Sequence, residues 1–271
     1  MKNPLICPVC KGALMKSESG LVCPFGHRFD RAAKGYVHLL PGNRALHGDN
    51  AEMIAARRRF LESGAYEPLS RAISEALGKH VPETGAVLDA GCGEGYYTAR
   101  LAEEHPEMQI YGVDLSRDAI RAAASRPPLK GQRVELYVAG VYALPFANGS
   151  FDAIASVFSP FAGDEFRRTL KSGGILLSVI PGARHLIELK GVLYDTPYEN
   201  TVSDYAVEGF SFLEKIELRE RILLKTPEQI HDLFAMTPYY HRTPRSGHER
   251  LAALPSLECE TSFEILVYRR R

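Results

Sequence analysis

The sequence has no apolar segment approaching the ~18 residues that a membrane span requires. Residues 1–20 also lack the apolar core of a signal peptide, so we expect a cytoplasmic protein with no membrane partner. Internal repeats and low-complexity tracts are missing as well. Hydrophobic residues make up 45% of the 271 and charged residues 24%, which excludes a disordered chain. The length fits one large domain, or one domain with a small appendage.

Cysteine is scarce, and its count of five is odd, so a complete set of disulfides is not expected. Charge of one sign is not in excess either, because 33 basic residues are balanced by 33 acidic ones. This balance hides an asymmetry. Residues 1–60 hold ten Lys or Arg and four Asp or Glu, a net charge of +6, which leaves −6 on the remainder. A basic amino-terminal segment indicates a polyanionic partner, with an unevenly charged solvated surface as the equal alternative.

Three of the five cysteines belong to a metal-ligand pattern near the amino terminus. The spacing C-x2-C-x12-C-x3-H is formed by Cys7, Cys10, Cys23 and His27. Each short pair forms a tight turn that directs two ligands to one point, and two such turns joined by a hairpin give a tetrahedral zinc site. Four protein ligands leave no open position, so the predicted zinc is structural. A module of about 30 residues buries too little core to fold alone, and a metal accounts for its folding.

A glycine-rich turn follows a predicted buried strand and precedes a predicted helix over residues 87–104. Its glycines are Gly91, Gly93 and Gly95. Glycine allows positive φ angles and lets a ligand lie against the backbone. A strand before such a turn and a helix after it are the context in which the turn binds a cofactor. We therefore predict a cofactor site at this turn.

The residues around the turn indicate which cofactor it binds. A pyrophosphate would favour G-x-G-x-x-G, whereas this chain has G-x-G-x-G preceded by Asp89. That form resembles motif I of the class I S-adenosylmethionine-dependent methyltransferases. Asp114 ends the second predicted strand, where a carboxylate can accept hydrogen bonds from both ribose hydroxyls of an adenosine group. The alternative role for Asp114 is a surface helix cap before Ser116.

The remaining predicted strands fit the same fold. They lie at 110–113, 134–138, 151–154 and 175–180, with a closing hairpin from 212–218 and 263–268. We predict an α/β class I methyltransferase fold, a Rossmann-like, mixed seven-stranded sheet, with a small N-terminal zinc-binding domain. The expected division is a zinc-binding module at 1–42, a helical linker at 43–80 and the methyltransferase domain at 81–271.

Several catalytic signatures of methyltransferases are missing. After the fourth strand, Ser159-Pro160-Phe161 stands in place of the Asn/Asp-Pro-Pro-aromatic motif of amino-group enzymes. Cys92 and Cys259 lack the Pro-Cys context of a cytosine-C5 nucleophile, and no open metal site is evident. The acceptor atom should therefore need only positioning and the loss of a weakly acidic proton.

The chain as a whole resembles the bacterial 23S ribosomal RNA guanine-N1-methyltransferases, which join an N-terminal zinc module to a class I methyltransferase domain. The matching segments are the two metal-ligand pairs, 35–41, 52–53, 56–58, 60–61, Tyr66, 68–69, 89–98, 181–182, 184–186, 188–191 and 236–238. In one departure, Ser159-Pro160-Phe161 replaces an Ala-Pro-Cys-like stretch. The resemblance implies methylation of guanine N1 in a hairpin loop (helix 35) of 23S ribosomal RNA. This RNA would be the partner, and the zinc module would recognise it.

The resemblance also assigns cofactor contacts. It implies that four residues contact S-adenosylmethionine: Tyr66, Gly93, Glu94 and His185. The predicted cofactor site adds the residues of the motif itself, Asp89, Gly91, Gly95 and Asp114. The alternatives are that Tyr66 belongs to the core and that His185 is a surface residue. No residue of the sequence stands out as the base that removes the N1 proton.

Two other functions stay open at this point. A small-molecule methyltransferase would use the zinc module only as structure, and a ribosome-assembly protein would bind RNA without catalysis. The basic amino-terminal segment argues against the first, and the intact glycine turn with Asp114 argues against the second. Two questions also stay open: whether the run Arg57-Arg58-Arg59 contacts phosphate or is a solvated helix face, and whether the protein forms a homodimer.

Overall fold

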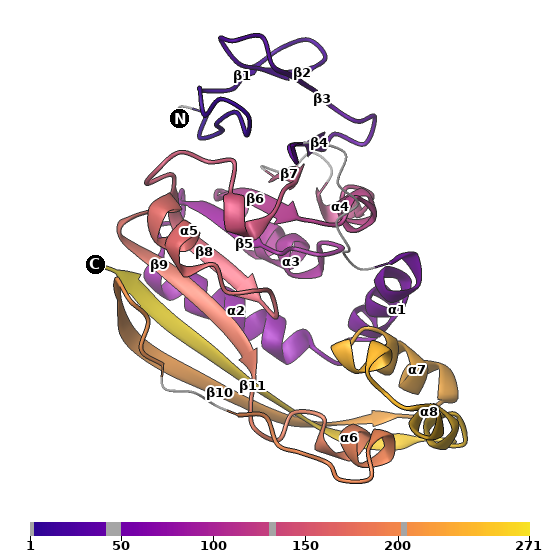
Figure 1. Cartoon of the computed structure of the whole chain (residues 1–271). Coiled ribbons are helices and arrows are strands. Elements are labelled where there is room, and N and C mark those ends of the chain that lie inside the picture. The colour runs from indigo at the N-terminus through magenta and orange to yellow at the C-terminus, as the bar shows by residue number, and fades with distance from the viewer. Residues whose placement is uncertain (1–2, 42–49, 130–133, 202–204) are drawn as a thin grey trace.

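A computed structural model describes residues 3–41, 50–129, 134–201 and 205–271. Within these residues the chain forms a three-stranded sheet near the amino terminus and an eight-stranded sheet in the body of the molecule (Figure 1). The large sheet has the order β10-β11-β9-β8-β5-β6-β7-β4. Its strands are β4 (Val37–His38), β5 (Ala86–Ala90), β6 (Gln109–Asp114), β7 (Val134–Val138), β8 (Phe151–Val157), β9 (Leu170–Pro181), β10 (Phe210–Leu224) and β11 (Leu257–Arg270).

The seven strands predicted for a methyltransferase sheet are confirmed. Strands β5 to β9 run parallel, and β11 lies antiparallel between β9 and β10. β5 is buried along its whole length, which explains why it is apolar except for Asp89, since a strand covered on both faces has no polar side. The closing hairpin is longer than predicted. In β10 the charged residues 219–221 interrupt the apolar pattern, and they are tolerated because this edge strand is largely exposed.

Helices cover the two faces of the large sheet. One face packs against α2 (Glu67–His80), α3 (Tyr96–Glu104) and α4 (Arg117–Ala123). In α2 the buried residues recur every three or four positions, which is the spacing of one helix face. The opposite face packs against α5 (Gly163–Thr169) and the amino-terminal module. The segment predicted as a linker thus contributes a helix, α2, to the core of the body.

The direction in which the chain adds strands reverses at the centre of the sheet, which is where open α/β sheets form a crevice. From β5 the chain proceeds outward through β6 and β7, and then returns to the other side of β5 with β8, β9 and β11. Ligands of open α/β sheets bind at such a reversal, outside the carboxyl ends of the strands. The two strands that border the reversal are β5 and β8. The glycine turn lies directly after β5, at this position.

Backbone hydrogen bonds attach the amino-terminal module to the body of the molecule. Its own sheet consists of β1 (Met15–Lys16), β2 (Gly20–Val22) and β3 (Arg28–Asp30). The eighth strand of the large sheet, β4, also comes from this segment and pairs with β7, beyond the seven predicted strands. Ile6 N–H donates to the carbonyl of Pro145 at 2.9 Å. Leucines of the module share one apolar cluster with Tyr137 and Phe146 of the body.

A helical cap lies beyond the carboxyl end of β9. It consists of α6 (Ile187–Leu193), which follows β9, and of α7 (Pro227–Ala235) and α8 (Arg245–Ala252), which connect β10 to β11 where their ladder continues past this end (Figure 1). The first long helix, α1 (Ala51–Glu62), packs on α7. The described residues also form the 3-10 turns η1 (Pro127–Leu129), η2 (Val141–Ala143) and η3 (Pro238–His241). In the described part of the chain, no helix combines the length and apolarity needed to cross a membrane.

Candidate functional site

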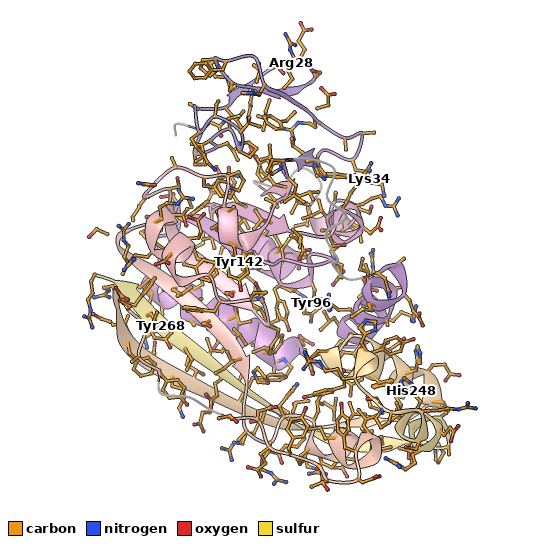
Figure 2. All side chains as sticks on the ribbon, viewed as in Figure 1. Arg28, Lys34, Tyr96, Tyr142, His248 and Tyr268 are labelled. Atoms are coloured by element: carbon orange, nitrogen blue, oxygen red, sulfur yellow. The ribbon has the colours of Figure 1, made fainter. Side chains whose placement is uncertain are left out.

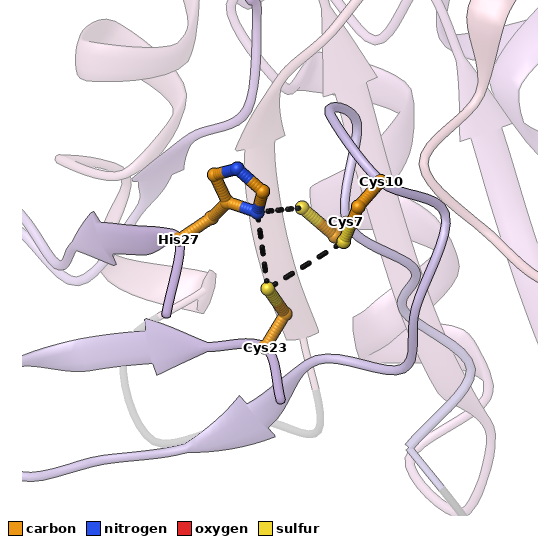
Figure 3. Close-up of side chains that lie close together, drawn as sticks. All are labelled: Cys7, Cys10, Cys23 and His27. Atoms are coloured by element: carbon orange, nitrogen blue, oxygen red, sulfur yellow. Dashed lines mark hydrogen bonds between the residues drawn. The ribbon is translucent and has the colours of Figure 1, made fainter. Parts of the chain in front are cut away.

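The predicted metal ligands Cys7, Cys10, Cys23 and His27 form one cluster (Figure 3). Their ligand atoms all lie within 4.8 Å of one another. Cys23 Sγ is 3.6 Å from Cys10 Sγ and 3.2 Å from His27 Nδ1. A tetrahedral zinc ion with bonds of ~2.0–2.3 Å requires ligand–ligand distances of about 3.5–3.8 Å. The donor set and its spacing therefore fit a structural zinc ion, which has four protein ligands and no open position.

Close packing explains two of the three glycines in the turn after β5. All three have positive φ angles: 83° at Gly91, 55° at Gly93 and 82° at Gly95. A β-carbon on Gly91 would lie 2.4 Å from Ser159 Oγ, and one on Gly95 would lie 2.8 Å from Cβ of Ala123 on α4. A β-carbon on Gly93 would meet no protein atom closer than 3.6 Å. Gly93 thus faces the side of the turn on which we expect the cofactor.

Asp114, at the end of β6, holds the glycine turn in place. Its Oδ2 accepts the N–H of Gly93 at 2.9 Å, and its Oδ1 accepts the N–H of Ser116 at 2.8 Å. Ser116, and not Asp114, caps α4, because its side chain accepts the N–H of Ala119. Each carboxylate oxygen can accept a second hydrogen bond. The contact of Asp114 with ribose hydroxyls stays a prediction, compatible with this geometry.

Asp89 braces the strand and the helix on either side of the turn. Its Oδ2 accepts the hydroxyl hydrogen of Thr98 on α3 at 2.6 Å. Burial raises the pKa of Asp89 to about 6; the Thr98 hydrogen bond acts in the opposite direction, and the charge of Asp114 raises it further. The structure thus gives Asp89 a supporting contact within the turn. A direct contact between Asp89 and the cofactor is still a prediction.

Glu94 forms a buried ion pair with Arg126, a residue that belongs to no recognisable sequence motif. The two residues are 1% and 7% exposed. Arg126 Nε donates to Glu94 Oε2 at 2.8 Å and to the Glu94 carbonyl at 2.9 Å. Burial raises the pKa of Glu94, and Arg126 opposes the shift. One carboxylate oxygen therefore fixes the turn, while Oε1 has no hydrogen-bond partner among the described residues.

Tyr66 and His185 belong to one aromatic group beside the crevice. The ring of Phe263 lies 4.8 Å from that of Tyr66 and 4.9 Å from that of His185. Phe60 packs on Tyr66 at 5.0 Å, and Phe158 stacks on His185 at 6.3 Å. Tyr66 and His185 are 3% and 8% exposed. The reading of His185 as a surface residue is therefore wrong, and both cofactor assignments stay predictions.

Backbone strain is concentrated beside this aromatic group. Phe158, directly after β8, has a φ of 52°, and Leu186, next to His185, has a φ of 56°. Bulky side chains rarely adopt this left-handed region, and such residues cluster at ligand sites. Both lie at the carboxyl end of the sheet, beside the strand reversal.

Unpartnered polar atoms gather around the crevice. Of the six buried side-chain oxygens that have no hydrogen-bond partner in the described part of the chain, four belong to the glycine turn, its contacts or the aromatic group: Tyr66 Oη, Tyr97 Oη, Ser159 Oγ and Glu94 Oε1. Buried polar atoms are normally paired, so a group of unpaired ones indicates a ligand. S-adenosylmethionine, which has ribose hydroxyls, an amino group and a carboxylate, would supply donors and acceptors for such oxygens. Ser159 was not predicted as a site residue, because only the fold brings it against Gly91 of the turn.

The protonation of His185 follows from its contacts. Its Nδ1 accepts the N–H of Ser262 at 3.2 Å, so the proton of the neutral ring is on Nε2. Burial, aided by the positive charge of Lys190, lowers the pKa of His185 to about 3. His185 can therefore donate a hydrogen bond through Nε2. It cannot accept a proton near neutral pH.

This shift predicts an acid-sensitive contribution to stability. Below pH 6.5 the unfolded chain protonates His185 while the folded protein does not, so the free energy of unfolding falls as the pH falls toward 3. Between pH 7.5 and pH 5, the free energy of unfolding of the unchanged protein should fall by about 2 kcal/mol more than that of His185→Gln. The size follows because one pKa unit corresponds to ~1.4 kcal/mol. Urea unfolding at both pH values measures this difference. Asp89 titrates in both proteins, so its contribution to the pH dependence cancels in the comparison. A pH-independent difference would show that the folded protein also protonates His185.

Comparison with known proteins gives matches to both parts of the chain. A family described as "RlmA, N-terminal", a zinc ribbon, matches residues 5–45, and one described as "Methyltransferase domain" matches residues 87–174. The 23S rRNA (guanine(748)-N(1))-methyltransferase of Streptomyces fradiae is 34% identical, over 93% of this chain and 91% of its own length. A relative from Micromonospora griseorubida, whose name provisionally gives the same guanine-N(1) activity, is 35% identical over 92% of this chain and 91% of its own.

A solved structure matches the fold of the body. The YcgJ protein of Bacillus subtilis has a TM-score of 0.51 at 17% sequence identity, covering 74% of this chain and 97% of its own. At this identity the match concerns the fold alone.

Proposed function

Because the chain belongs to the family of 23S rRNA (guanine-N1-)-methyltransferases with an N-terminal zinc ribbon, we propose that it methylates N1 of a guanine in 23S ribosomal RNA, using S-adenosylmethionine. The observation that carries this proposal is a similarity over 92% of the chain, which includes the metal cluster and the glycine turn together. We place the target in the hairpin loop of helix 35, as the family resemblance implies. A ribosomal RNA substrate is compatible with a cytoplasmic protein.

The cofactor, when bound, supplies a methyl group on a positively charged sulfur. We propose that it is held by the glycine turn, by Asp114 for the ribose, and by Glu94 with the Tyr66–His185 group around the remainder. These residues are fixed before the cofactor binds: Asp114 by two backbone N–H groups and Glu94 by Arg126. A preorganised site of this kind lowers the entropic cost of aligning donor and acceptor.

The methyl transfer itself needs the loss of a proton. Guanine N1 carries a hydrogen, so the N1–H bond is replaced by an N1–C bond and the proton leaves. His185 cannot take this proton, because its pKa is lowered to about 3 and its Nδ1 already accepts a hydrogen bond. We propose that alignment of the methyl group with N1 provides most of the acceleration and that the proton passes to solvent.

The amino-terminal module is suited to hold the RNA. Arg28 lies at its outer end, and Lys34 lies on the side that faces α4 (Figure 2). The Lys34 ammonium donates to the Ser125 hydroxyl, just beyond α4, and α4 packs against Gly95 of the turn. Positive charge therefore extends from the module toward the cofactor site, where it would attract phosphates. That the protein acts as a homodimer stays a prediction, which sedimentation would test.

Reverse transcription of cellular 23S RNA tests the proposed reaction. A methyl group on N1 blocks Watson–Crick pairing, so reverse transcriptase stalls one nucleotide before the modified guanine. A strain that lacks this protein should lose one such stop in the helix 35 loop, and the restored gene should bring it back. The Gly93→Asp gene should fail to do so, because its carboxylate would occupy the side of the turn that faces the cofactor.

A matched control is available at the other end of the sheet. Gly149 has a φ of 61° in the turn before β8, so Gly149→Asp imposes similar backbone strain away from the crevice. This variant should restore the stop. If the stop persists in the deletion strain while another methylated nucleotide disappears, the guanine-N1 assignment is wrong. If bulk ribosomal RNA takes up no labelled methyl group, a small-molecule substrate becomes the better explanation.

A further inference from the structure

Lys190, on α6, is a lysine with no exposed surface and no acidic partner among the described ion pairs. Its Nζ donates to the carbonyl of Tyr198 at 3.0 Å and to Asn200 Oδ1 at 2.8 Å. The same Nζ lies 4.5 Å from the ring centre of Tyr198 and 5.7 Å from that of Tyr239. A buried cation satisfied by neutral oxygens and aromatic faces is costly, so its position calls for an explanation.

The hydrogen bonds of Lys190 fix the segment after α6 to the loop that carries His185. Asn200 continues the network, because its Nδ2 donates to the Gly182 carbonyl at 2.8 Å and its backbone N–H donates to the Ala183 carbonyl at 2.8 Å. Lys190 and Asn200 together therefore hold Tyr198 against the carboxyl end of β9. This is the edge at which the cofactor residues also lie.

Three tyrosines form a wall over the buried ammonium. The ring of Tyr194 lies 5.9 Å from that of Tyr198 and 6.4 Å from that of Tyr239. Tyr198 is 50% exposed, whereas Lys190 behind it is fully buried. Asn200 binds Gly182 and Ala183 just before His185, whose ring lies 6.3 Å from that of Tyr66, so the wall adjoins the predicted cofactor site. We call Tyr194, Tyr198 and Tyr239 the tyrosine wall.

We propose that the tyrosine wall is the subsite for the target base, with the guanine ring stacked on Tyr198, and that Lys190 is the positioning residue that holds Tyr198 there. This inference rests on the proposed function. A base turned out of an RNA loop is commonly held by stacking on an aromatic side chain, and here such a ring is half-exposed and rigidly held beside the methyl-donor site.

Other aromatic residues near the crevice serve the base less well. The hydroxyl of Tyr97 is buried within the crevice, in the group of unpartnered oxygens. Phe161 is 42% exposed, but its ring packs edge-on against Phe166 at 5.6 Å, and it belongs to the side of the sheet that α5 covers. The tyrosine wall combines exposure, a fixed orientation and proximity to the Tyr66–His185 group. Phe158, which is 43% exposed and stacks on His185, is the rival position for the base, and normal RNA kinetics in Tyr198→Ala would favour it.

Kinetics on Tyr198 variants test the proposal with the full protein and a helix 35 RNA hairpin. Tyr198→Ala should lower kcat/KM for the RNA by about 10- to 100-fold, the range for loss of one base–aromatic stack. Its affinity for S-adenosylmethionine, measured calorimetrically, should not change. Tyr198→Phe should retain nearly full activity, because it keeps the ring. Phe212→Ala removes an aromatic of similar exposure, 44%, from the distant end of β10 and should behave like the unchanged protein.

Asn200→Ala tests the positioning role without removing the buried charge. It should raise KM for the RNA several-fold while leaving cofactor affinity intact. The inference fails if Tyr198→Ala methylates RNA normally, if Tyr198→Phe is as impaired as Tyr198→Ala, or if Tyr198→Ala loses cofactor affinity in proportion to activity. The proposed function fails separately, when the unchanged protein leaves no reverse-transcription stop on the hairpin.

Discussion

Asp114→Ala is expected to weaken the binding of S-adenosylmethionine by about 10- to 100-fold, which corresponds to the ~1.5–3 kcal/mol of a hydrogen-bonded charged group. Two contributions act in the same direction. The variant loses the carboxylate proposed for the ribose hydroxyls, and it also loses the acceptor for the Gly93 N–H, which leaves the turn less ordered. Isothermal titration of the cofactor measures the change directly.

Two variants separate these contributions. Asp114→Asn keeps one carbonyl oxygen, so it should retain part of the affinity if orientation of the turn matters. Asp118→Ala removes a nearby acidic residue that pairs with Arg121 on the surface of α4, at 3.1 Å, and should bind the cofactor normally. An unchanged affinity in Asp114→Ala would remove Asp114 from the cofactor site.

Loss of the zinc ion is expected to abolish RNA methylation while leaving cofactor binding nearly unchanged. Structural zinc contributes ~10 kcal/mol or more to the folding of such modules, so Cys10→Ser should unfold the loops that carry the ligands. The glycine turn is held by β5, β6 and α4, and it should survive. Labelled-methyl transfer to the RNA hairpin and cofactor titration give the two readouts. Zinc content is measured on the same samples.

Zinc removed with a chelator and then restored provides the control, because the reconstituted protein should regain full activity. Normal RNA methylation by the metal-free protein would show that the module does not hold the RNA. A parallel loss of cofactor affinity would instead show that the module supports the body. The leucines that the module shares with the core of the body make a lower melting temperature expected in either case.

Much of the architecture could be predicted because it depends on local sequence. The strands of the body are apolar runs bounded by turns, the metal ligands have a characteristic spacing, and the glycine turn stands between a strand and a helix. The structure confirms these elements. β4 could not be predicted, because two residues, Val37 and His38, are too short for any periodic pattern.

The contacts that complete the site depend on residues distant in the sequence. Arg126 is adjacent to no recognisable motif, yet the fold brings it from the end of α4 to Glu94. From the sequence, Lys190 would be expected on the exposed face of an amphipathic helix. In the structure it is surrounded by Asn200 and Tyr198. Tertiary packing decides which residue pairs with a buried charge, and a single sequence carries no local signal of that choice.

The pairing of β4 with β7 also bears on how the protein avoids self-association. An open sheet has two edge strands, whose free N–H and C=O groups can recruit a strand from another molecule. At one edge, β10 carries alternating acidic and basic side chains that discourage such pairing. At the other edge, β4 pairs with the carboxyl-terminal end of β7, at Tyr137 and Val138, which are buried and apolar. We therefore expect a fragment that begins after the amino-terminal module to expose the hydrogen-bonding groups of this part of β7 and to aggregate more readily than the full protein.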